Sequence, residues 1–194
     1  NWNTIWWRGI NANASKKKWR YCLWDQDATF DHYINYTGVP STTPTADPCD
    51  PQNLSDPGGQ GHIPILNALL KNPGFKQYYV MRYFDLANTT LNCSRMTAIL
   101  DSMINVIAPE MPGQIAKWGG NLTQWQQNVQ DMRNFILARC TTVVNSYTPC
   151  NGASGPYKIK VNVVPAGAGT VDINSLNLTS FVWTGTYPGS INTN

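Results

Sequence analysis

Charged side chains are scarce in this 194-residue sequence, because Lys, Arg, Asp and Glu together make up only 13% of it. This is about half the share found in average soluble domains. The formal net charge is +3, and the one basic run, residues 16–18, is too short to indicate nucleic-acid binding. The composition argues against a highly charged partner, and it is more typical of an extracellular protein than of a cytosolic enzyme.

Long apolar runs are also lacking. No stretch approaches the roughly 18 consecutive apolar residues that a membrane-spanning helix needs, so we expect no membrane span. The sequence has no initiator Met and no basic segment followed by an apolar one. We therefore expect the chain to be an internal piece of a longer protein, with any targeting signal upstream of it.

Histidine is limited to His32 and His62, and no Ser, Cys or acid stands in a recognisable pattern with either. A hydrolytic triad and a His-rich metal site are therefore not predicted. The glycine-rich run at 58–61 follows a Pro-rich coil and lacks the Gly-Lys-Ser/Thr ending of a nucleotide-binding loop, so we interpret it as a turn.

Five cysteines are present, at 22, 49, 93, 140 and 150, and their spacing fits neither a zinc motif nor a Cys-x-x-Cys redox motif. Together with the low charge they favour disulfides in an oxidising compartment over buried free thiols. We predict that Cys140 pairs with Cys150, which would tie the end of a long helix to the following loop. The odd number leaves one cysteine unpaired or bridged elsewhere. Asn-x-Ser/Thr glycosylation motifs begin at seven positions: Asn13, Asn35, Asn53, Asn88, Asn92, Asn121 and Asn177.

Aromatic residues make up 11% of the chain and hydrophobic residues 42%, which predicts a folded protein of one domain and a small appendage. Alternating aromatic and polar residues predict a β-hairpin from strands at 4–8 and 19–24. Residues 35–62 are rich in Pro, Gly, Thr and Asp and predict a long loop that is either functional or pinned by packing.

Apolar residues at helical spacing predict four helices between residues 63 and 147. The third should run from about Cys93 to just before Pro109, and the fourth and longest should begin after Asn121 as N-cap. The pattern then changes to a period of two at 157–163 and 171–173, which predicts a hairpin that starts a β-rich module.

Two carboxylates, Asp25 and Asp27, follow the apolar end of the second strand. Carboxylate oxygens at a strand end can bind Mg²⁺, with phosphate oxygens completing its octahedron. Two other interpretations stay open on spacing alone. One is a solvated turn in which an Asp caps a backbone amide. The other is a calcium loop that includes Asp31, although the Gly and terminal Glu of an EF-hand are missing.

The residues around this pair resemble the CotH kinase family, a group of spore-coat and surface proteins with a divergent protein-kinase-like fold. The segment 18–30, Lys-Trp-Arg-Tyr-Cys-Leu-Trp-Asp-Gln-Asp-Ala-Thr-Phe, is similar to that family's metal-binding segment, and 1–9 is similar to the part that precedes it. The resemblance extends through the helices to about residue 150 and does not include the β segment.

The resemblance implies a role for several residues. Asp25 would be the metal-binding Asp, Asp27 would assist it or orient the loop, and Asn3 would support a second metal ion. Arg8 could reach a phosphate, whereas a cation stacked on tryptophan is the alternative that its strand position favours. The family's catalytic Asp and its phosphate-binding Lys would lie upstream of this chain, so we expect the piece alone to be inactive.

The predicted fold class is α+β: a helical, C-lobe-like half of a kinase-like fold preceded by a β-hairpin, and then the start of a β-rich module resembling a sandwich or repeat. Residues 1–150 and 151–194 are the expected units. The expected function is that of a secreted or cell-surface, bacterial, CotH-type kinase, which uses Mg²⁺ and ATP to phosphorylate Ser or Thr of a surface protein. The alternative is a non-catalytic, kinase-like structural or adhesive module. The sequence does not indicate an oligomeric state.

Overall fold

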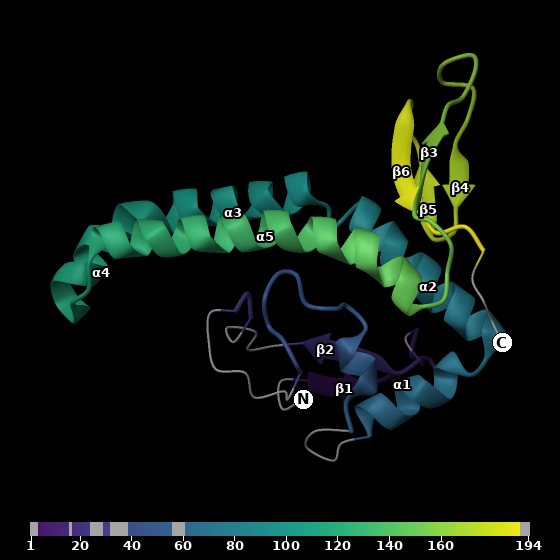
Figure 1. Cartoon of the computed structure of the whole chain (residues 1–194), viewed down its shortest axis with the longest axis horizontal. Helices are drawn as coiled ribbons and strands as arrows, with labels where there is room; N and C mark the ends of the chain where they lie inside the picture. The colour runs from purple at the N-terminus through teal and green to yellow at the C-terminus, as the bar shows by residue number, and fades with distance from the viewer. Residues whose placement is uncertain (1–3, 16, 24–28, 32–38, 56–60, 191–194) are drawn as a thin grey trace.

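The computed structural model describes residues 4–15, 17–23, 29–31, 39–55 and 61–190. Small two-stranded sheets lie on either side of a helical region, so the chain is mixed α and β, as predicted (Figure 1). None of the described helices combines the length and the apolar character that crossing a bilayer requires.

The N-terminal hairpin consists of β1 (Thr4–Trp7) and β2 (Arg20–Leu23). The strands are antiparallel, with Thr4 opposite Leu23 at the open end and Trp7 opposite Arg20 near the turn. This confirms the predicted hairpin over its described residues. In the loop that follows, η1 (Asp50–Asn53) is a short 3₁₀ turn with a proline in its first turn.

Asparagine N-caps begin three of the helices. The side-chain oxygens of Asn72, Asn92 and Asn121 accept hydrogen bonds from backbone N–H groups in the first turn that follows each of them. The helical region comprises α1 (His62–Leu70), α2 (Pro73–Asn88), α3 (Cys93–Ile107), η2 (Ala108–Glu110), α4 (Met111–Trp118) and α5 (Leu122–Cys150).

The predicted third and fourth helices are confirmed as α3 and α5, and the N-cap role of Asn121 is confirmed as well. Helix α4 was not predicted, because Pro109, Pro112 and Gly113 disfavour a helix. Both prolines lie in the first turns of their elements, where the missing N–H group would have no helical partner in any case.

The C-terminal β segment pairs differently from the prediction. The expected hairpin between 157–163 and 171–173 is wrong, because β3 (Tyr157–Val161) pairs with β6 (Trp183–Tyr187), and β4 (Val171–Ile173) pairs with β5 (Leu176–Leu178). Asn174 and Ser175 alone connect β4 to β5, and a two-residue loop is the commonest hairpin connection, so β4 pairs with the strand that directly follows it.

The main core brings together segments that are far apart in sequence. Cys49 from the loop, Val80 and Phe84 from α2, Tyr147 from α5 and Tyr187 from β6 form one buried cluster. The core therefore includes part of the β segment, and β6 lies against α2 (Figure 1). The division into units 1–150 and 151–194 remains a prediction.

The predicted Cys140–Cys150 disulfide is wrong. Both residues lie on α5, where ten residues of helix separate them by about 15 Å, far beyond the reach of a disulfide. Cys150 instead pairs with Cys49, with 6.1 Å between their Cα atoms, and Cys140 pairs with Cys93, with 5.7 Å. Cys22 is the exposed free thiol among the described cysteines.

Candidate functional site

Asn3, Asp25 and Asp27 lie outside the described residues, whereas most of the hairpin next to them in the sequence is described. The backbone positions of Thr4 and Leu23 are partners at the open end of that hairpin. In sequence, Asn3 directly precedes the first of these positions, and Asp25 comes two residues after the second.

Arg8 is described, and it stacks on an aromatic ring. Its guanidinium carbon lies 4.8 Å from the ring centroid of Trp19, and that of Arg20 lies 5.9 Å from Trp7. This confirms the cation–π alternative for Arg8. Arg8 follows the last residue of β1, so four strand residues, or about 13 Å, separate it from the open end. A contact between Arg8 and phosphate remains a prediction.

The aromatic residues of the hairpin are accessible on the surface. Trp6 is 38% exposed, Trp19 58% and Tyr21 52%. Trp6 and Tyr21 face each other, with 4.4 Å between their ring centroids, and both lie within 6 Å of the His62 ring at the start of α1. His62 therefore takes part in an aromatic cluster that joins the hairpin to the helical region.

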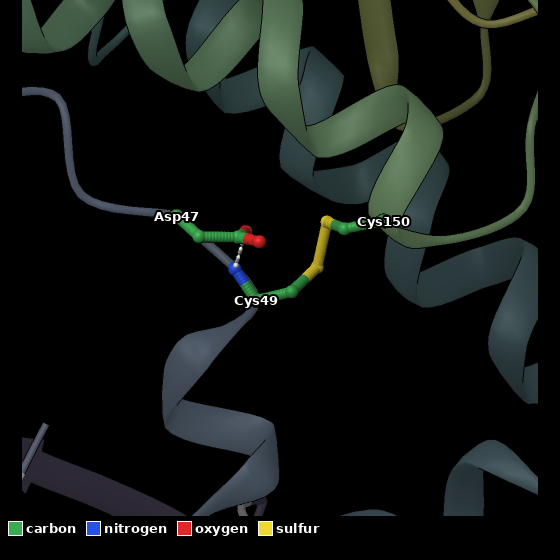
Figure 2. Close-up of side chains that lie close together, drawn as sticks. All are labelled: Asp47, Cys49 and Cys150. Atoms are coloured by element: carbon green, nitrogen blue, oxygen red, sulfur yellow. Dashed lines mark hydrogen bonds between the residues drawn. A yellow bond between two sulfur atoms is a disulfide. The ribbon is translucent and has the colours of Figure 1, made fainter. Parts of the chain in front are cut away.

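A second group of donor atoms is found between the long loop and the end of α5. A carboxylate oxygen of Asp47 and the sulfur atoms of Cys49 and Cys150 lie within 4.8 Å of one another (Figure 2). The two sulfurs form a disulfide, so neither is available as a thiolate ligand. The Asp47 carboxylate accepts a hydrogen bond of 2.8 Å from the Cys49 backbone N–H, so its role here is to close a turn.

The long loop is pinned at several points, which agrees with one of the two predictions for it. The disulfide holds Cys49, and the Arg139 guanidinium on α5 donates to the carbonyl oxygens of Pro44 and Ala46. The amide of Asn67 on α1 also donates to the carbonyl of Gln52 in η1, at 3.1 Å. These bonds fix residues 44–52 against α5 and α1.

Asp85, which was not predicted from the sequence, is completely buried on α2. Its carboxylate accepts hydrogen bonds from the Tyr187 hydroxyl at 2.6 Å, the Ser175 backbone N–H at 3.0 Å and the Asn174 amide at 3.3 Å, and also from the Ser175 hydroxyl. Arg82 donates to that same hydroxyl. The sequence signal for this site was a single acid between two apolar residues, Phe84 and Leu86. An acid in such a position indicates a buried carboxylate, and buried carboxylates require hydrogen-bond partners.

Burial governs the ionisation of the core tyrosines. It raises the pKa of Tyr83 to about 12, against a smaller opposing effect of the Arg139 charge. Burial also raises the pKa of Tyr147 and, together with the hydrogen bond to Asp85, that of Tyr187. All three tyrosines therefore stay protonated at neutral pH. On the surface, the hydrogen bond from Arg133 lowers the pKa of Asp101.

A comparison with protein-family models gives a match over most of the chain. The family model described as CotH kinase protein matches residues 2–143, which is well over half of the chain and includes the hairpin and most of the helical region. No curated protein and no solved structure matches the chain significantly. Residues 2–9 and the segment 18–30, which are similar to CotH proteins, lie inside the matched range. Because the match extends over more than half of its length, the chain belongs to the CotH kinase protein family.

Proposed function

We propose that this chain contributes the metal-binding and helical part of a secreted or cell-surface protein kinase, which transfers the γ-phosphate of ATP to Ser or Thr of a surface protein. Membership of the CotH family carries this proposal. The hairpin register supports it, because the two segments with the expected metal ligands continue from positions that are strand partners, Thr4 and Leu23.

The donor set suits the proposed cofactor. Asp25 and Asp27 offer carboxylate oxygens and Asn3 offers an amide oxygen, which are the ligand types that Mg²⁺ prefers. In a kinase, Mg²⁺ neutralises charge on the phosphates of ATP. In this proposal Asp25 holds the first ion, Asn3 supports the second, and Asp27 orients the loop. Arg8, at the turn end of the hairpin, stabilises the hairpin by stacking on Trp19.

The proposed location rests on the cysteines. Two disulfides join distant segments, which is compatible with an oxidising, extracellular compartment, where such bonds persist.

The exposed aromatic hairpin favours a second candidate, a kinase-like module that binds a surface without catalysis. Trp7 and Trp19 are 45% and 58% exposed, and exposed aromatic side chains are typical of binding surfaces. In that case the metal ligands would have no catalytic role.

The test is Mg²⁺- and ATP-dependent incorporation of labelled phosphate by the full-length protein that contains this chain, with candidate surface proteins present. We expect Asp25→Asn to abolish labelling, because the amide removes the charge that holds the metal ion. Asp172→Asn is the matched control, since Asp172 lies on β4 and outside the matched range, and it should retain full labelling. Circular dichroism checks that both variants fold.

Loss of labelling in Asp25→Asn alone would support the kinase. Equal labelling in the wild type and Asp25→Asn would contradict the role of Asp25. No labelling in any of the folded proteins, across the panel of surface substrates, would favour the adhesive module.

A further inference from the structure

Helix α3 carries apolar side chains on its outer face, away from α5. Its inner face packs along α5, with Leu100 buried and the Cys93–Cys140 disulfide joining the two helices (Figure 1). On the other face, Ile99 is 42% exposed, Met103 63% and Val106 73%. Their spacing of four and three residues places them on one stripe of the helix.

Along the chain, opposite charges flank this stripe. Arg95 is four residues before Ile99, and Glu110 is four residues after Val106, at the end of η2. Both side chains are exposed, and neither takes part in an ion pair within the described part of the chain, where Arg133 pairs with Asp101. A cation therefore precedes the apolar residues along the chain, and an anion follows them.

The two charges are equally far from Met103. Eight residues of α-helix separate Arg95 from Met103, which is about 12 Å. Four residues of α-helix and three of 3₁₀-helix separate Met103 from Glu110, which is again about 12 Å. A second identical helix, antiparallel and related by a two-fold axis at Met103, would bring each arginine to the same height along the helix pair as a glutamate of the other copy.

We propose that this face of α3 is a self-association surface, through which two copies of the chain pair antiparallel about Met103. A two-fold interface uses the same patch on both copies and therefore requires a self-complementary patch. Apolar residues in the centre and compensating charges at the rim meet this requirement. The contact is about 24 Å long, which is small for a stable dimer, so we expect a weak, reversible dimer.

The basic test is sedimentation velocity of the 194-residue chain over a concentration series from micromolar to millimolar. We expect the weight-average sedimentation coefficient to rise with concentration toward that of a dimer. Met103→Glu should keep the chain monomeric throughout, because the two introduced carboxylates would meet at the axis. Val164→Glu is the matched control, since Val164 is an exposed apolar residue in a distant loop, and it should dimerise like the wild type.

Charge exchange tests the antiparallel geometry. Arg95→Glu alone and Glu110→Arg alone should each weaken the dimer roughly tenfold, because like charges would then meet at both ends. An equimolar mixture of the two variants should regain the affinity of the wild type, since a mixed pair has opposite charges at both ends. The double variant in one chain should also regain it.

A wild-type chain that stays monomeric at millimolar concentration would overturn the proposal. So would a dimer that Met103→Glu leaves intact, or a mixture of the charge variants that remains as weak as each variant alone. Circular dichroism separates these outcomes from a failure to fold.

Discussion

The two β regions of this protein are built in opposite ways. In the N-terminal hairpin, strands that are neighbours in sequence pair with each other, and the aromatic side chains remain largely exposed. In the C-terminal segment, β3 pairs with the distant β6, and Tyr187 is 4% exposed, within the core of the helical region. The N-terminal hairpin lies inside the range that matches the CotH family, and the C-terminal segment lies outside it.

This difference separates the part that we propose for function from the part that stabilises the fold. The hairpin is held by local pairing, by stacked cations and by the ring of His62. The C-terminal segment is held by a buried carboxylate, a shared core and two hydrogen bonds between Asn88 on α2 and Thr186. Substitutions in the two regions should therefore affect stability very unequally.

Removing the long-range disulfide should have the largest effect. Cys49→Ala with Cys150→Ala opens a cross-link between residues 101 apart, which should lower the free energy of unfolding by about 4.7 kcal/mol, because the unfolded chain regains loop entropy. The shorter Cys93–Cys140 link spans 47 residues and should cost about 4 kcal/mol. Urea unfolding measures both, and Cys22→Ala is the control with little expected change. Equal stability of the wild type and the Cys49/Cys150 variant would contradict this pairing.

Removing the buried carboxylate should detach the C-terminal segment from α2. Asp85→Ala leaves the Tyr187 hydroxyl and the Ser175 amide without an acceptor, and we expect a loss of about 3 kcal/mol. Asp172→Ala removes an exposed acid from the same segment and should change stability by less than about 0.5 kcal/mol. In a hydrogen-exchange experiment, the β6 amides should exchange faster in Asp85→Ala than in the wild type, and Asp172→Ala should show no such change. Unchanged protection of β6 would argue against Asp85 as the anchor.

The smallest effect is expected in the hairpin. Trp19→Ala removes the ring on which Arg8 stacks, but this ring is mostly exposed, so the loss should be within about 1 kcal/mol. Trp183→Ala is the matched comparison, because Trp183 packs against the main core, and it should cost about 3 kcal/mol. Urea unfolding of both variants checks the order. A larger loss for Trp19→Ala would mean that the hairpin is part of the cooperative core.

Much of the helical region could be predicted from the sequence, because its signals are local. Asn92 and Asn121 stand directly before apolar residues at helical spacing, and each accepts a backbone hydrogen bond in the structure. The hairpin was predictable for the same reason, since its alternation lies within two short segments. Helix α4 was not, because its prolines disfavour a helix except in the first turn.

The candidate site was predictable only as a pattern. The acids at 25 and 27 were found by their position after an apolar strand and by resemblance, and they lie outside the described residues. Asp85 could not have been assigned a partner from sequence, because Asn174, Ser175 and Tyr187 are about 90 to 100 residues away.

The sequence by itself determined the starts of α3 and α5, the N-terminal hairpin, the mixed α and β class and the CotH family. Only the tertiary structure decided the disulfide pairs, the partner of β3 and the burial of Asp85. The physical reason is distance along the chain. Capping and periodicity act within one or two turns, whereas the partner of Cys150 or of β3 depends on which surfaces meet when the helices pack.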